Sequence, residues 1–201
     1  MVRAKVIMLE AIKKKNLTPI GVIVERGFPV NDPLLDCGAN LLMHVSATCG
    51  RDEVSKILAL KPDVNARDNI GRTALHYACR AANQEAFEVL IECIDVEGME
   101  DIDVDAVTNA GVTPLMMAVE SADIQLVAFA LNQNLNPFLK DALNRTVREY
   151  ALHYRNLKGH DMLQLIETAM NQWNTQTSEE ERFGSQVDYS GHYVEFQQMQ
   201  E

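Results

Sequence analysis

The 201-residue sequence has few of the features that mark a membrane or secreted protein. No apolar run approaches the roughly 20 residues that a membrane helix needs. Residues 1–10 carry charges on both sides of a very short apolar run, which makes a poor secretory signal. The four cysteines form no C-x-x-C pair, and such usage is typical of a reducing compartment. We therefore expect a cytoplasmic protein without membrane insertion, although a cytoskeletal, ciliary or organellar assembly would leave the same pattern.

Basic residues are missing from the middle of the chain. Residues 81–139 hold no Lys or Arg and 11 Asp or Glu, in a chain of formal charge −11. This balance argues against nucleic acid as a ligand, because phosphate binding needs clustered cations, and against anionic membrane surfaces. A surface of one charge attracts partners of the opposite charge, so the acidic segment is a candidate surface for a basic protein.

The sequence also lacks a recognisable catalytic or metal-binding constellation. Cys49 and Cys79 come without a recognisable base and orienting partner, which favours packing as small hydrophobes. The acidic run 101–105 begins like a calcium loop, but Ala106 and Val112 stand where that motif needs Gly and Glu. We therefore expect no enzyme activity, no metal, no cofactor and no small-molecule substrate.

What the sequence does contain is an internal repeat. Segment 71–78 (GRTALHYA) is echoed at 111–118 (GVTPLMMA) and more weakly at 39–46 and 144–151. Leu75, Ala78 and Cys79 have the spacing of one helical face. Thr73 and Thr113 suit helix N-caps, and Pro114 suits a first helical position. Each repeat therefore predicts a helix that begins just after the Thr.

These motifs resemble the ankyrin-repeat family, whose unit of about 33 residues carries a T-P-L-H-x-A signature. The resemblance implies an all-α solenoid of about five helix-turn-helix repeats with β-hairpin-like connecting loops. We place this solenoid at residues 1–170, followed by an extended C-terminal tail at 171–201. The repeats are expected at about 4–36, 37–69, 70–109, 110–142 and 143–170.

Several local expectations accompany the resemblance. It implies that His44 and His76 tie one repeat's turn to the next through hydrogen bonds. Thr18 is expected to cap a helix of the first repeat. The third repeat is longer than the unit, and its excess at 93–101 predicts an acidic loop or helix extension. The fifth repeat has extra residues after Thr146, so its first helix is expected to run one turn longer.

The resemblance further implies a protein partner on the concave face, which the hairpin tips and the exposed sides of the first helices form. Tyr77 and Met117 are the expected apolar anchors, because Met adapts its shape and Tyr is common in binding hot spots. Carried over by position, the face comprises Asn69, Arg72, Tyr77, Arg80, Asn109, Val112, Met117, Ser121, Asn144 and Arg145.

The tail is polar and acidic, yet it holds five of the 12 aromatic residues. A disordered tail would be poor in aromatics. It is therefore predicted to fold back on the solenoid or to dock on a partner as an extended segment, with a solvated linker as the remaining alternative. Trp173 is expected to cover the exposed end of the last helix. The tail residues expected in contact are Trp173, Phe183, Tyr189, Tyr193 and Phe196.

Together these features predict a non-enzymatic adaptor that binds one or more proteins as an accessory or scaffolding subunit of a larger assembly. The alternative is a regulator or inhibitor that presents the acidic 81–139 surface to a basic protein. The two differ in salt dependence, because screening weakens a charge-led complex more than an apolar one.

Overall fold

The computed structural model describes residues 2–92, 101–153 and 155–183. Within these ranges the chain forms ten α-helices and no β-strand. The helices are α1 (Val2–Lys13), α2 (Thr18–Glu25), α3 (Leu41–Thr48), α4 (Arg51–Leu58), α5 (Ala74–Arg80), α6 (Gln84–Glu92), α7 (Pro114–Glu120), α8 (Ile124–Asn132), α9 (Val147–His153) and α10 (Arg155–Phe183).

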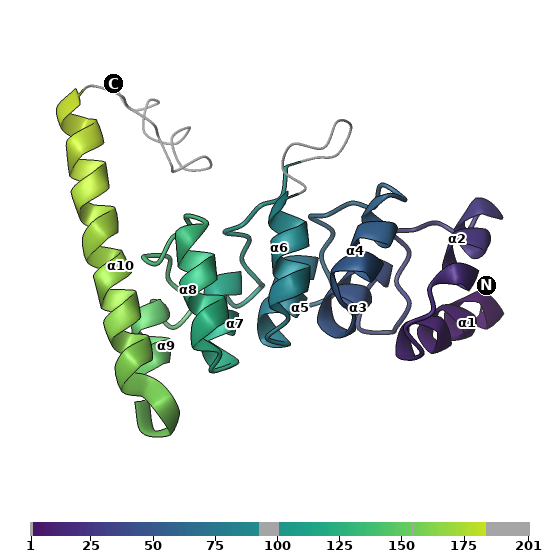
Figure 1. Ribbon diagram of the computed structural model, residues 1–201, viewed down its shortest axis with the longest axis horizontal. Coiled ribbons are helices and arrows are strands. Elements are labelled where there is room, and N and C mark those ends of the chain that lie inside the picture. The colour runs from purple at the N-terminus through teal and green to yellow at the C-terminus, as the bar shows by residue number, and fades with distance from the viewer. Residues whose placement is uncertain (1, 93–100, 154, 184–201) are drawn as a thin grey trace.

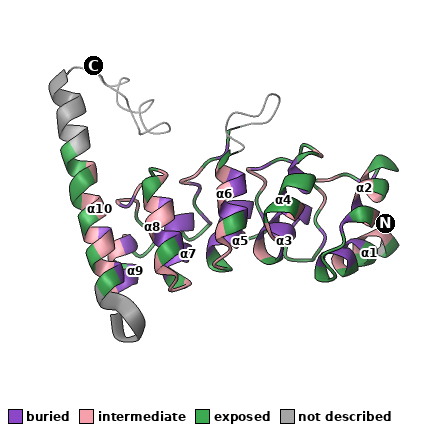
Figure 2. Cartoon of the chain, viewed as in Figure 1, coloured by how far each residue is buried: buried purple, intermediate pink, exposed green. Residues whose placement is uncertain are grey.

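Consecutive helices form pairs that stack side by side in one row, from α1 and α2 at one end to α9 and α10 at the other (Figure 1). The first helix of each pair packs on the first helix of the next, in the order α1, α3, α5, α7 and α9. The buried residues lie mainly where the helices face their neighbours in the row (Figure 2). No pair encloses a core alone, so the predicted all-α solenoid is confirmed.

The first helices begin where capping predicts. Thr113 Oγ1 accepts a hydrogen bond from Met116 N (3.2 Å), and Pro114 is the first residue of α7. Asn40 does the same for α3, where its Oδ1 accepts from Met43 N (3.0 Å). Each such cap satisfies one backbone donor that the first helical turn leaves unpaired.

The predicted helical face is the core. Leu75, Ala78 and Cys79 are fully buried. The second helices also contact one another, since the Phe87 ring of α6 meets the Phe129 ring of α8 edge-on, with 5.8 Å between centroids. Such edge-to-face contacts stabilise beyond the area that they bury.

Two expectations about helix bounds are wrong. Thr18 is the first residue of α2, and the N-cap is Leu17; Thr18 N instead donates to Asn16 Oδ1 (3.3 Å). In the fifth pair, α9 has seven residues, as α5 and α7 have, so it is not a turn longer. The additional residues belong to α10, which begins at Arg155 directly beyond residue 154.

The start of the expected extended tail is helical instead, because α10 continues through 171–183. That stretch contains no Gly or Pro and is rich in Gln and Glu, which favour helix propagation. Tyr189, Tyr193 and Phe196 lie outside the described residues, as does the expected acidic extension at 93–100.

Candidate partner-binding face

The loop tips of four repeats lie in a row that backbone hydrogen bonds hold together. These bonds run from Asn69 N to Cys37 O (3.0 Å), from Asn109 N to Ile70 O (2.9 Å), and from Ala142 N to Ala110 O (2.8 Å). Each loop turns at the same position, where the backbone has a positive φ, namely Gly38, Gly71, Gly111 and Asn144. At Gly71 a Cβ would lie 2.7 Å from Asn109 Oδ1, so a side chain there would disturb the link to the next tip.

One exposed apolar side chain precedes each turn. Ile70 is 52% exposed and Leu143 is 70% exposed, and Cys37 and Ala110 are exposed as well. We call these four residues the tip row. The sequence reasoning missed them, although the position just before the turn residue is apolar in all four copies and could have revealed them.

Several residues of the expected concave face are engaged within the solenoid. Asn69 Nδ2 donates to Asp36 O (2.9 Å), and Asn109 Nδ2 donates to Asn69 O (3.2 Å), so both amides link neighbouring tips. Ser121 Oγ donates to Ala118 O (2.7 Å). These side chains rigidify the face that they were expected to offer to a partner.

Arg72 and Tyr77 form a triad with the buried Asp68. Asp68 Oδ2 accepts from Arg72 Nε (2.7 Å) and from the Tyr77 hydroxyl (2.9 Å), and the guanidinium lies over the Tyr77 ring, 4.6 Å from its centroid. Burial alone would raise the pKa of Asp68, but the hydrogen bonds from Arg72 and Tyr77 lower it.

The last tip repeats the triad. Asp141 Oδ2 accepts from Arg145 Nε (2.8 Å) and from the Tyr150 hydroxyl (2.9 Å), and Arg145 lies 4.7 Å from the Tyr150 ring centroid. Against the opposing effect of burial, these bonds lower the pKa of Asp141 to about 2. Burial and the bond to Asp141 raise the pKa of Tyr150 to about 12. Both triads therefore hold a charged pair in place beside a tip.

The repeat between the two triads has Thr108, Val112 and Met117 in the corresponding positions. Thr108 Oγ1 accepts from Val112 N (3.1 Å), which replaces the bond to the Asp carboxylate. Met117, an expected anchor, is buried with 8% exposed, whereas Tyr77 is half-buried. Of the remaining expected residues, Val112 is half-buried, and Arg80, Asn144 and Arg145 are exposed.

His76 has the expected linking role. Its Nδ1 lies 3.2 Å from Thr73 N at the start of α5, and its Nε2 lies 3.0 Å from Val112 O in the next repeat. The neutral ring that accepts at Nδ1 and donates at Nε2 satisfies both contacts. Burial lowers the pKa of His76 to about 4, which keeps this ring neutral.

His44 does not share this role. Asn40 caps α3, so the residue equivalent to His76 is Met43, and His44 occupies the position of Tyr77. Its Nε2 is buried without a hydrogen-bond partner among the described residues. The expectation failed because the weak echo at 39–46 was aligned one residue out of register.

The acidic middle segment is partly neutralised from the preceding repeat. Arg51 of α4 pairs with Glu88 and Glu92 of α6, each at 2.7 Å, and its backbone N donates to Glu85 Oε2 (3.1 Å). Other carboxylates of this segment, such as that of Asp101, lie exposed. Arg51 therefore offsets part of the negative charge that the sequence concentrates in residues 81–139.

The described residues include the thiols and the acidic side chains that the sequence offered as candidates for chemistry. Cys49 and Cys79 are buried, as expected, and burial raises the pKa of Cys79. Nowhere in the described ranges do three or more His, Cys, Asp or Glu side chains gather as a metal site would require. Among the helices described, none has the length and apolarity to cross a membrane.

The aromatic residues of the tail are only partly located. Trp173 is half-buried on α10 and lines a groove shared with α8. It does not cover the end of the last helix, because α10 continues beyond it to Phe183.

Comparisons with known proteins agree with this repeat geometry. Residues 8–103 match the family model described as ankyrin repeats (3 copies). The chain is 29% identical over 155 residues to neurogenic locus notch homolog protein 1 of Danio rerio, covering 68% of this chain and 6% of that protein. It is 30% identical over 124 residues to neurogenic locus notch homolog protein 2 of Homo sapiens, covering 61% of this chain and 5% of that protein. The chain therefore spans only a small part of these relatives, and its residues 8–103 are ankyrin repeats.

Proposed function

We propose that this chain is a non-enzymatic adaptor that holds a protein partner on the tip row and the adjoining first helices. Ankyrin repeats mediate protein–protein interaction, and the finer role suggested here is that of an accessory or scaffolding subunit in a larger assembly. The observation that carries the proposal is the tip row itself, in which Cys37, Ile70, Ala110 and Leu143 expose apolar side chains at equivalent positions.

Single exposed apolar residues are common and need no explanation, but an aligned set is different. Hydrogen bonds fix each tip to the next, so these side chains keep a constant order along one edge. The two triads hold Tyr77 and Tyr150 beside the row. A partner would therefore meet a rigid surface. Binding would order this surface little further, so the loss of conformational entropy in the solenoid would be small.

The test compares two exposed tip residues with an exposed apolar residue elsewhere. Ile70→Asp and Leu143→Asp place charges on the tip row, while Val22→Asp does so on α2, where Val22 is 44% exposed. Partners recovered by native co-purification and mass spectrometry are expected to remain with wild type and Val22→Asp and to be lost from the tip variants. Equal recovery by all four proteins, or recovery of the monomer alone, would contradict the proposal.

Salt dependence distinguishes this adaptor role from the alternative, a regulator or inhibitor that presents residues 81–139 to a basic protein. A complex on the tip row is expected to survive moderate salt, because apolar contacts are not screened. A complex on the acidic segment would weaken steeply and associate more slowly after charge reversal at Asp101, which is exposed. Glu97 and Glu100 belong to the same acidic segment and lie outside the described residues.

A further inference from the structure

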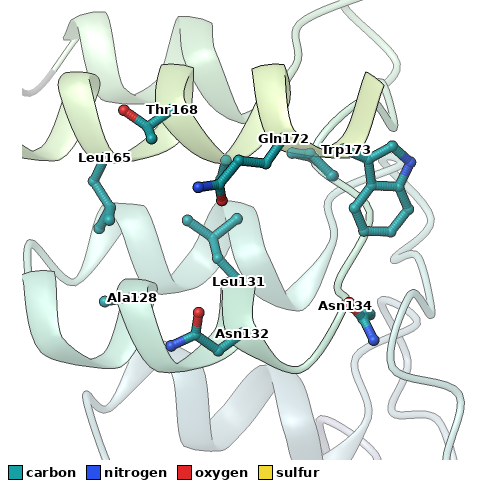
Figure 3. Close-up of a pocket in the computed structure, with 10 residues that line it drawn as sticks. Ala128, Leu131, Asn132, Asn134, Leu165, Thr168, Gln172 and Trp173 are labelled. Carbon is teal, nitrogen blue, oxygen red and sulfur yellow. The ribbon is translucent and has the colours of Figure 1, made fainter. Parts of the chain in front are cut away.

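A groove of about 390 Å³ lies between α8 and α10 at the C-terminal end of the solenoid (Figure 3). Its floor and walls are Ala128 and Leu131 of α8 and Leu165 and Ala169 of α10. Leu165 extends from α10 toward Ala128 and Leu131 extends from α8 toward Gln172, so both point into the space between the helices, and Trp173 lies at one end beside Asn134. The remaining lining residues are Asn132, Pro137, Thr168 and Gln172, so no charged side chain lines the groove.

The sequence spacing explains which residues of α10 line the groove. Leu165, Thr168, Ala169, Gln172 and Trp173 follow the i, i+3, i+4, i+7, i+8 pattern of one helix face. Small side chains on both helices leave space between faces that bulkier residues would fill. The apolar residues of the lining therefore lack packing partners on the side that faces the groove, and a suitable occupant would supply those contacts.

We propose that residues 184–201 of the same chain bind in this groove as an extended segment. In the proposed register, Tyr189 lies against Trp173, and Tyr193 lies between Leu131 and Leu165. The chain outside the described structure begins directly after Phe183, at the end of the helix that forms one wall.

The reach of the segment sets this register. Trp173 precedes Phe183 by ten residues, which is about 15 Å of α-helix, and an extended chain returns that distance in about five residues. Tyr189 is the first aromatic residue that this return brings to Trp173. Leu165 precedes Trp173 by eight residues, which is about 12 Å of α-helix. Four extended residues span about the same length, so Tyr193, four residues after Tyr189, reaches Leu165.

The chemistry of the segment matches that of the groove. Residues 189–194 (YSGHYV) carry no Asp, Glu, Lys or Arg, as the lining carries none, whereas Asp188 and Glu195 flank this stretch. Aromatic rings prefer offset or edge-on contact with one another, which the Trp173 ring offers to Tyr189. Asn132, Asn134 and Gln172 supply amides that can pair with tyrosine hydroxyls or with the extended backbone.

Trp173 is the single tryptophan of the chain, so its fluorescence reports directly on the groove. The full chain is compared with residues 1–183, which keep α10 whole. Removal of 184–201 is expected to shift the emission to the red and to raise the acrylamide quenching constant about twofold, because a half-buried ring loses its cover. A peptide of residues 184–201 added to 1–183 is expected to reverse both changes.

Paired variants locate the contact. Tyr189→Ser with Tyr193→Ser is expected to reproduce the truncation, while Phe196→Ser, beyond the groove in this register, leaves the spectrum unchanged. On the groove side, Thr168→Arg is expected to block the peptide, whereas Asn171→Arg, exposed on α10 but outside the lining, is not.

Two outcomes would overturn the proposal. The first is an emission spectrum and quenching constant that do not change when 184–201 are removed. The second is Trp173 protection that rises with protein concentration, which would place a second copy in the groove instead of the chain's own tail. Folding of the truncated and substituted proteins is checked by the far-ultraviolet circular dichroism of the helices.

Discussion

Asp105 shows how one half-buried carboxyl contributes to the pH dependence of the solenoid. Its Oδ1 accepts a hydrogen bond from Asn136 N of the next repeat (2.9 Å). Burial, opposed by this bond and aided by the nearby Asp103, raises the pKa of Asp105 to about 6, against an ordinary value of 3.8. The fold therefore favours the protonated carboxyl, so the stability that it contributes is full below pH 3.8 and is lost as the pH rises to about 6.

We predict that Asp105→Asn stabilises the protein above pH 6. The amide keeps an oxygen for Asn136 N and never ionises. The gain in the free energy of unfolding is expected to be about 1–2 kcal/mol at pH 7.5 and close to zero near pH 4. Urea unfolding across this pH range measures the difference from wild type. Asp101→Asn, an exposed control, is expected to show no such pH-dependent gain; a similar gain there, or none at Asp105, would refute the assignment.

At the same scale, residue chemistry explains what the sequence could predict and what it could not. Thr113 and His76 were predictable, because capping and the repeat signature specify a donor, an acceptor and their spacing. The linking role was wrongly assigned to His44. Several polar residues near this weak echo could cap the helix, and only the backbone geometry shows that Asn40 is the N-cap of α3. The tip row was missed because exposure at a turn depends on how neighbouring repeats stack.

At the scale of elements, the two triads show how side chains fix the tips. Asp68 has a fully buried side chain and Arg72 is 13% exposed, so this pair is largely removed from water. A buried charge that loses its partner destabilises far more than an apolar replacement of the whole group. The neighbouring repeat supplies that replacement in Thr108, Val112 and Met117.

We therefore predict a larger loss of stability for partial than for complete replacement of the first triad. Arg72→Val alone leaves the Asp68 carboxylate buried and is expected to lower the free energy of unfolding by about 3 kcal/mol. The triple variant Asp68→Thr, Arg72→Val, Tyr77→Met, which copies the neighbouring repeat, is expected to lose only about 1 kcal/mol. Chemical denaturation compares the two. A triple variant less stable than the single one would show that the triad acts through packing and not through charge.

Element boundaries were less predictable than element types. Helix periodicity and capping identified the first helices, but they did not reveal the length of α10. A polar stretch without Gly or Pro is compatible with a helix and also with a solvated linker. The groove between α8 and α10 likewise follows from how far apart two helices pack. No local pattern in the sequence encodes that separation.

At the scale of the molecule, neighbouring helices of the solenoid pack on one another, and the buried residues extend along the row from Met8 to Ile166. Ile20 of α2 and Ile166 of α10 are both fully buried, at opposite ends of the row. In a compact globule, a defect at either place would weaken the same cooperative unit. In a stack of repeats, stability is a sum of repeat and interface contributions, so a defect is expected to act mainly where it lies.

We predict that Ile20→Ala and Ile166→Ala destabilise different halves of the chain. Each removes a buried side chain of the same size and is expected to cost about 2–4 kcal/mol locally. Hydrogen exchange followed by mass spectrometry is expected to show faster exchange in α1–α4 for Ile20→Ala and in α7–α10 for Ile166→Ala, with the distant end close to wild type. Each variant serves as the control for the other. Faster exchange along the whole chain in both variants would mean that the repeats unfold as one unit, and that binding at the tip row would stabilise α10 as strongly as α5.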